Sequence, residues 1–295
     1  MAGKGGVGKT TVGASLAIAA AKAGSDVVLI ELEGHSNLST LFGQDQLTYD
    51  ELEINVEQLE LAGRLRARQI KPDDALSDYL DGAGLGPLTS RLSTSGAMEV
   101  VATTAPGIRD LLTLGKIRQI EQAGTADLIV VDAPAAGHAL TFLTAAAGLA
   151  ESTSSGPVRE QADLVLEMFA DDSRCQVVLV TLPEETPVSE TIETAFNLEE
   201  DVGIKLAPVV VNGLWSSIDG LEKAAGSSLA QNSLAQNAAQ YRLARITEQQ
   251  AEVARLGAEL PLDQVHLPFL FRTDFGYEEL AVLAAALTEQ LGAGS

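Results

Sequence analysis

The sequence predicts an α/β protein built on a doubly wound, mainly parallel sheet with helical insertions. Three observations predict this class. A glycine-rich loop at residues 3–11 is followed by a helical segment and then by the apolar run 27–30, which is typical of a strand buried on both faces. A second apolar run, 127–132, ends in an aspartate. The chain has 295 residues, 46% of them hydrophobic, and can therefore bury a large core.

The loop Gly3–Thr11 reads GKGGVGKTT and fits the phosphate-binding pattern G-x-x-x-x-G-K-[ST]. Glycines in this pattern let successive backbone N–H groups curl around the phosphates of a nucleoside triphosphate. We expect Lys9 to reach the β- and γ-phosphates and the Thr10 hydroxyl to bind Mg²⁺, while the helix N-terminus adds partial positive charge. The residues expected to contact the nucleotide are Gly3, Gly5, Gly6, Val7, Gly8, Lys9, Thr10 and Thr11.

The elements around the loop follow in the expected order. Ala, Leu and Ile dominate a helix predicted from Thr10 to Lys22, and Gly24 is placed to end it. A phosphate-binding loop normally joins a strand to a helix, and the two residues Met1-Ala2 are too few to supply that strand. This strand lies near the middle of such a sheet, and its loss would leave unpaired strand edges in a buried place. We therefore expect the first strand to be missing here and the native protein to begin upstream.

Composition narrows the function classes. A formal net charge of −22 argues against binding to nucleic acid or to anionic lipid, since both attract basic surfaces. Apolar runs are too short for a transmembrane span and no secretory signal is visible, so we expect a cytoplasmic protein without a direct membrane anchor. The single cysteine, Cys175, excludes an intrachain disulfide framework and any multi-cysteine zinc or iron–sulfur site.

The apolar run 127–132 has the form of a Walker B strand. Its terminal Asp132 is expected to hold Mg²⁺, usually through water. Residues 133–138 contain Pro134 and Gly137, and we interpret them as a turn that can move with the γ-phosphate.

Together these motifs resemble the anion-transporting ATPase family, which contains the arsenical-pump ATPases and the ATPases that target tail-anchored proteins. The segments that carry the resemblance are GKGGVGKTT at 3–11, LIELEGHSNLSTLF at 29–42, APGIRDLL at 105–112, VVDAPAAGHALTFL at 130–143 and VVVNGLW at 209–215. The resemblance implies a Mg²⁺-dependent, ATP-hydrolysing dimer that couples the state of ATP or ADP to a partner or client protein. It also places Lys4 as the signature lysine of a deviant Walker A loop, a residue that reaches the nucleotide of the facing subunit.

Carried over position by position, the resemblance implies further roles. Glu33 falls on the family aspartate thought to orient the attacking water, so the implied catalytic residues are Lys4, Lys9 and Glu33. The family histidine is replaced by Ser36, with His35 one place earlier, which departs from the family pattern. Glu33 can also be a solvated acid at the end of a strand. Gly137 is implied as a γ-phosphate contact or hinge.

The implied base pocket lies farther along the chain. Asn212 follows the apolar strand 206–211 and falls on the family asparagine that reads the adenine edge. An amide both donates and accepts hydrogen bonds, which suits the donor and acceptor atoms of adenine. It can equally be a simple strand-to-loop asparagine. Pro268 and Phe269, after the strand 264–267, fall where the family closes the other side of the pocket.

We expect one P-loop ATPase domain over residues 1–295, with a helical insertion subdomain at 44–125 and a further helical segment at 138–172. Within the insertion, the pattern predicts a strand at 56–61, helices at 72–81 and 107–123, and a Gly/Pro/Ser-rich joint at 82–96. In the family such helices form the client-binding region. With three methionines and one cysteine, the chain lacks the Met-rich groove and the cysteine clusters of the named relatives, so the client stays unknown.

Two helical regions complete the chain. Residues 216–260 contain the tandem repeat SLAQN-SLAQN, whose five-residue period fits no helix face, and we expect a loose helical hairpin or a disordered segment there. A last helix at 277–291 is expected to pack against the sheet through Leu280, Val282, Leu283 and Leu287.

Alternatives to the dimeric switch ATPase remain. The dimer can form between identical copies or with a paralogous ATPase. A nucleotide-binding regulatory subunit with little hydrolysis of its own would keep Lys9 and Thr10 and tolerate the changes at 34–36. A partition or positioning ATPase shares the Lys4 loop, but it should carry a basic surface or a cationic tail, and this chain has neither.

Overall fold

The computed structural model describes residues 1–32, 38–44, 46–82, 107–134, 136–226 and 233–292. Its first sheet has the spatial order β2 (Leu52–Glu53), β3 (Leu65–Ile70), β1 (Val27–Leu32) and β4 (Leu128–Asp132). A second has the order β6 (Val180–Thr181), β8 (Val209–Leu214) and β9 (Gln264–Pro268), and β5 (Gln176–Val177) pairs with β7 (Lys205–Leu206). Of these pairings only β2–β3 is antiparallel, which confirms the predicted mainly parallel α/β class.

The first two residues lie between the sheets. The Met1 amine donates to the Val131 carbonyl of β4 at 2.7 Å, and burial lowers its pKa. On the other side, the Ala2 N–H donates to the Val178 carbonyl at 2.9 Å, and the Ala2 carbonyl accepts from the Val180 N–H at 2.8 Å. A cavity of about 560 Å³ adjoins them, lined by β4 on one side and by residues 175–178 on the other. The expectation that the strand ahead of the loop is missing stays a prediction.

Helices cover both faces of these strands. Val27 and Leu29 of β1 share one core with α1 (Lys9–Lys22) and α12 (Tyr277–Gly292), which pack against each other. Val28 and Ile30, which point the other way, share a second core with α6 (Ile108–Gln122), α7 (Ala136–Ser152), α8 (Pro157–Ala170) and α9 (Glu185–Asn197). A strand with helices on both faces is the doubly wound arrangement that the apolar run at 27–30 predicts.

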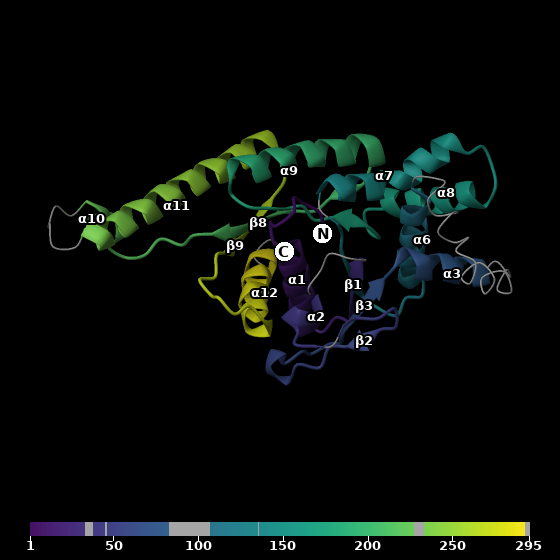
Figure 1. The fold of residues 1–295 in the computed structure, drawn as a ribbon, viewed down its shortest axis with the longest axis horizontal. Helices are drawn as coiled ribbons and strands as arrows, with labels where there is room; N and C mark the ends of the chain where they lie inside the picture. Colours follow the sequence, from purple (N-terminus) through teal and green to yellow (C-terminus); the bar gives the residue numbers. More distant parts are fainter. Residues whose placement is uncertain (33–37, 45, 83–106, 135, 227–232, 293–295) are drawn as a thin grey trace.

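The predicted helices are present with small shifts. The helix after the loop ends at Lys22, and Gly24 follows with φ +102°. The helices expected at 72–81 and 107–123 are α3 (Pro72–Gly82) and α6, and the segment 138–172 contains α7 and α8. Figure 1 shows α3, α6 and α8 gathered at one end of the molecule. The joint predicted at 82–96 lies outside the described residues from 83 onward, and the division into one domain with insertions stays a prediction.

The strand expected at 56–61 is wrong. Residues 57–59 form a 3₁₀ turn, η1, that Glu60 closes with φ 50°, and β2 and β3 lie on either side of it. Val56 and Leu59 are one turn apart, and Leu59 is fully buried, so these two apolar residues reflect a single buried turn. The strand β3, inside the segment 44–125, pairs with β1 along its whole length.

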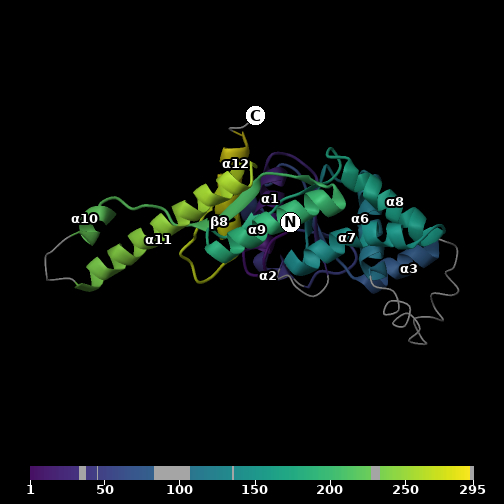
Figure 2. The ribbon, with the colours of Figure 1, turned by 90° about the horizontal axis from the view of Figure 1, so that it is seen from above.

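Of the two expectations for 216–260, disorder is wrong in the second half, whereas two helices that pack against each other agree with a helical hairpin. After α10 (Leu221–Ala225), α11 (Ser233–Glu259) is one continuous 27-residue helix that begins with the second SLAQN. The first SLAQN, at 228–232, lies outside the described residues. Farther along α11, Ile246, Gln249 and Leu256 are buried at helical spacing, so tertiary contacts stabilise what the repeat leaves undecided. Figures 1 and 2 both show α10 and α11 extending away from the sheets, opposite α3 and α8.

The last helix packs as predicted except at one residue. Leu280, Leu283 and Leu287 are buried against α1 and β9, but Val282 is 52% exposed. At about 100° per residue, Val282 lies about 200° around the helix from Leu280, so it faces solvent. Two short elements, α2 (Leu38–Leu41) and the π-helical turn η2 (Leu198–Val202), complete the fold. None of the described helices is both long and apolar enough to cross a membrane.

Candidate functional site

The phosphate-binding loop is held tightly against β6 and β8. At Gly3, with φ +149°, a Cβ atom would lie 2.2 Å from the Val180 carbonyl oxygen. At Gly8, with φ +91°, it would lie 2.4 Å from the Asn212 amide nitrogen. A side chain at Gly3 would therefore collide with fixed backbone, whereas one at Gly8 would displace the Asn212 side chain, and both would strain the backbone.

Lys9 lies across the loop. Its half-buried ammonium donates to the Lys4 carbonyl at 3.2 Å. Burial lowers the pKa of Lys9, and the nearby Asp132 carboxylate opposes that shift. An ammonium held beside the backbone of a glycine-rich loop suits the binding of phosphate oxygens.

Thr10 and Asp132 form a pair beside the loop. The Thr10 hydroxyl donates to Asp132 Oδ2 at 2.6 Å, and Asp132 is only 6% exposed. Burial raises the Asp132 pKa, while the Thr10 hydrogen bond and the charges of the N-terminus and Lys9 lower it. Among the described residues, Asp132 Oδ1 has no hydrogen-bond partner. A buried carboxylate oxygen with free lone pairs beside a hydroxyl suits a hard cation such as Mg²⁺, so these residues fit that ion.

A buried acid that the sequence argument missed stands next to this pair. Glu31 of β1 is 5% exposed and is the register partner of Asp132. Neighbouring residues in register on parallel strands point to the same face, so both acids face the side of α1. The alternation Val27, Leu29, Glu31 within the strand is the signal that could have found it. Glu33, His35 and Ser36 lie outside the described residues.

Lys4 has a partner on α9. Lys4 Nζ lies 2.7 Å from Glu190 Oε1, and their side chains are 36% and 40% exposed. The two residues are 186 positions apart, and no sequence pattern indicates the contact. The loop therefore contacts α9 as well as β6 and β8.

Asn212 lies within β8, rather than after a strand ending at 211. Its amide nitrogen donates to the Val7 carbonyl of the loop at 2.9 Å. The pairing of β8 with β9 shifts register between Val211 and Leu214, where Gly213 has φ +76°. This bulge aims the Asn212 side chain at the loop, so the residue predicted to read a base also supports the phosphate-binding backbone.

Pro268 and Phe269 lie beside Leu214, at the end of β8. Pro268 ends β9, and the Phe269 N–H donates to the Leu214 carbonyl at 2.8 Å. Phe269 is 45% exposed. Its ring belongs to an aromatic cluster that the sequence argument missed, because its members come from three separate segments. The cluster consists of Trp215, Tyr241, Phe269 and Phe271, with the Arg242 guanidinium over two of the rings.

Gly137 and His138 lie in a helix rather than in the mobile turn expected at 133–138. Both lie in the first turn of α7, which begins at Ala136, and both are exposed. A helical start so soon after Asp132 leaves only Ala133 and Pro134 as described connecting residues. Gly137 is thus placed at a helix N-terminus, where backbone N–H groups favour anions.

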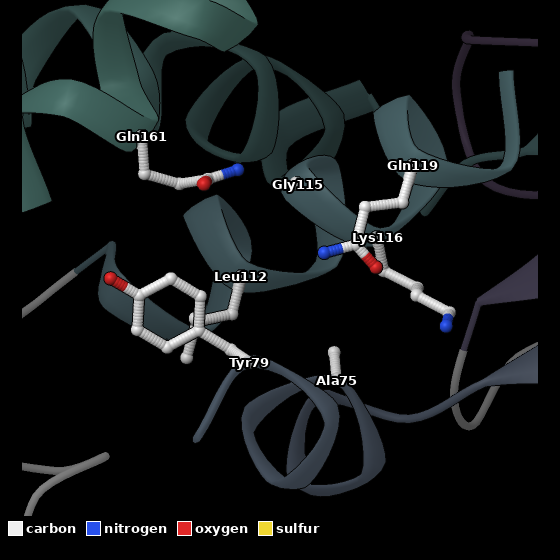
Figure 3. A pocket seen from close by; sticks show the side chains of 7 residues that line it. All are labelled: Ala75, Tyr79, Leu112, Gly115, Lys116, Gln119 and Gln161. Atoms are coloured by element: carbon white, nitrogen blue, oxygen red, sulfur yellow. The ribbon is translucent and has the colours of Figure 1, made fainter. Parts of the chain in front are cut away.

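A small hollow elsewhere is no candidate. Figure 3 shows it between α3, α6 and α8, with Tyr79, Gly115 and Gln161 among its lining side chains. Its volume of about 10 Å³ has room for one water molecule at most. The described residues also contain no group of three or more His, Cys, Asp or Glu side chains that could hold a metal ion.

Comparison with known proteins agrees with this geometry. The family model of the anion-transporting ATPases matches residues 1–155, which is more than half of the chain. The chain belongs to the anion-transporting ATPase family. Membership in this family confirms the predicted resemblance, and the matched residues include the loop and both switch segments.

Several relatives of this chain are named as ATPases. The chain is 35% identical over 217 residues to ATPase BagA of Mycobacterium tuberculosis, covering 71% of this chain and 63% of the relative. It is 28% identical over 261 residues to ATPase GET3B of Arabidopsis thaliana, covering 72% and 63%. It is 34% identical over 146 residues to ATPase get3 of Aspergillus niger, covering 48% and 40%. The chain thus matches less than two thirds of the length of each of these relatives.

Proposed function

We propose that the chain is a Mg²⁺-dependent ATPase that works as a dimer and couples its nucleotide state to a partner or client protein. The observation that carries the proposal is the Thr10 hydroxyl on Asp132, with the second carboxylate oxygen of Asp132 unpartnered among the described residues, directly beside the phosphate-binding loop. Membership in a family named for its ATPase activity supports the same reading.

Each residue has a distinct task in this proposal. Lys9 and the loop amides hold the β- and γ-phosphates, and Thr10 and Asp132 hold Mg²⁺. Bound Mg²⁺ neutralises negative charge that develops on the phosphates. Glu33 orients the attacking water and can accept its proton. Lys4 reaches the nucleotide of the second subunit and stabilises charge there.

The base end of the site is proposed from the ends of two strands. Asn212 uses its amide toward the adenine edge, and Pro268 and Phe269 bound the pocket on the other side. The Phe269 ring is exposed enough to stack on a base. Gly137, at the start of α7, contacts the γ-phosphate or acts as the hinge of the switch that follows Asp132.

The partner is proposed only by class. Hydrolysis relaxes the switch segments and moves the helices attached to them, which changes how a client or partner protein binds. The second subunit is a copy of this chain or a paralogous ATPase, and the cytoplasm is the expected setting.

The test is steady-state ATP hydrolysis as a function of protein concentration, with and without Mg²⁺. We expect Lys4→Ala to lower turnover about a hundredfold or more, the usual cost of losing one charge-stabilising group, while ATP binding stays near wild type. Lys22→Ala is the matched control, because Lys22 is exposed in the last turn of α1 and should have no effect. Wild-type turnover of Lys4→Ala would refute the role of Lys4 on the facing subunit.

A second candidate follows from the departure at His35 and Ser36. If these changes impair the first switch, the chain serves as a nucleotide-binding regulatory subunit with little hydrolysis of its own. Such a chain binds ATP through Lys9 and Thr10, hydrolyses it slowly alone, and raises the turnover of a co-purifying paralogue. Purification from the native source, with mass spectrometry of the partners, separates the two candidates.

A further inference from the structure

Lys4 is engaged through both its main chain and its side chain. Its carbonyl accepts a hydrogen bond from the Lys9 ammonium at 3.2 Å, and its own ammonium lies 2.7 Å from Glu190. The lysine proposed to serve the facing subunit is therefore bound within its own subunit, to an acid that lies outside the phosphate loop.

The helix that presents Glu190 is itself fixed from another direction. Arg255 of α11 donates to the Glu185 carbonyl at 3.0 Å and to the Ser189 hydroxyl at 3.1 Å. Arg245, also of α11, pairs with Glu184 immediately before α9. Figure 1 shows α9 running beside the end of α11 that lies nearest the sheets. Because its helix is anchored at the adjoining residues, Glu190 has a defined position relative to the loop.

Glu190 and a phosphate would compete for Lys4. An ammonium has three donors, but a carboxylate and a phosphate that share it repel each other. The ion pair is more than one third exposed on both sides, so it favours the bound position by about twofold to fivefold only. Such a preference is large enough to bias the lysine and small enough for a Mg²⁺–triphosphate on a second subunit to overcome.

We propose that Glu190 is a positioning residue that holds Lys4 on its own subunit and releases it to a nucleotide bound by the second subunit. The inference rests on the proposed function, in which Lys4 acts across the dimer. Glu190 then sets the protein concentration at which the dimer becomes active, and it does so without touching the nucleotide.

The first test measures the contact directly. Lys4 is acylated with a water-soluble N-hydroxysuccinimide ester, and its labelling rate is compared by peptide mass spectrometry with that of exposed Lys22 in the same chain. We expect Glu190→Gln to raise the Lys4 rate about twofold to fivefold. Glu193→Gln is the matched control, because Glu193 is exposed on the same helix and its substitution removes the same charge. Equal Lys4 rates in wild type and Glu190→Gln, or equal gains in both variants, would overturn the inference.

The second test measures the consequence. In Glu190→Gln, the protein concentration for half-maximal ATPase should fall about twofold to fivefold, with the affinity of dilute protein for ATP unchanged. The effect should vanish in a Lys4→Ala background. An unchanged activation concentration would overturn the Glu190 role while leaving the proposed function intact. If Lys4→Ala itself turns over at the wild-type rate, the proposed role of Lys4 across the dimer fails and the inference fails with it. Faster Lys4 acylation in Glu190→Gln would in that case show that the ion pair with Glu190 exists but has no role in activating the dimer.

Discussion

Gly8→Ala should destabilise the protein through a contact with Asn212 that can be measured separately from backbone strain. At Gly8 the backbone has φ 91° and ψ 27°, a left-handed conformation that costs an alanine about 1–2 kcal/mol. The new Cβ would also lie 2.4 Å from the Asn212 amide nitrogen. That side chain must swing away and give up its 2.9 Å hydrogen bond to the Val7 carbonyl, worth about 1 kcal/mol. The expected total loss is about 2–3 kcal/mol.

A double-mutant cycle isolates the second contribution. Asn212→Ala alone should cost about 1 kcal/mol, and the double variant should cost no more than Gly8→Ala alone, because both changes remove the same hydrogen bond. The coupling is therefore about 1 kcal/mol. Gly6→Ala is the matched control: Gly6 has φ +86°, but its Cβ would meet nothing within 4 Å. It should cost only the strain and add independently to Asn212→Ala.

The assay is urea unfolding of the four cycle members and the control, followed by circular dichroism and tryptophan fluorescence. Costs that add for Gly8→Ala and Asn212→Ala to within about 0.3 kcal/mol would refute the shared contact. A cost for Gly8→Ala no greater than that for Gly6→Ala would refute the close approach itself.

Two further predictions concern the metal pair and the last helix. Burial raises the pKa of Asp132 in the folded state above its value in the unfolded state. The contribution of Asp132 to the free energy of unfolding is therefore fully present below the unfolded-state pKa and is lost as the pH rises through the folded-state pKa. Asp132→Asn should therefore have a higher melting temperature than wild type at pH 7 in Mg²⁺-free buffer, and this gain should shrink as the pH falls toward the unfolded-state pKa. The same variant should lose ATPase activity by about a hundredfold or more. A lower melting temperature than wild type at pH 7 would contradict the burial argument. Leu283→Ala should cost about 2–5 kcal/mol in urea unfolding and Val282→Ala less than about 1 kcal/mol, because Leu283 is 2% and Val282 52% exposed; equal costs would contradict the packing of α12 on α1.

Short segments of the sequence are enough to predict the nucleotide machinery. The glycine spacing at 3–11, the helix that follows and the apolar runs at 27–30 and 127–132 each have a local cause in steric freedom, helix propensity or burial on both faces. The structure confirms these elements within a few residues, and the family comparison confirms the class that they indicate. Local patterns fail at 56–61, because a few apolar residues within a six-residue segment do not distinguish a strand from a single buried turn.

Which side chains meet is decided by tertiary structure. Thr10 and Asp132 are 122 positions apart, Lys4 and Glu190 are 186 apart, and Val7 and Asn212 are 205 apart. The loop pattern and the aspartate at the end of the strand indicate Thr10 and Asp132 as candidates, and the family resemblance adds Lys4 and Asn212. The sequence contains no signal for Glu190, because that contact depends on how α9 packs beside the loop and is anchored by α11. Residue chemistry is local, whereas the pairing of charges follows from strand order and helix packing, and these are properties of the whole chain.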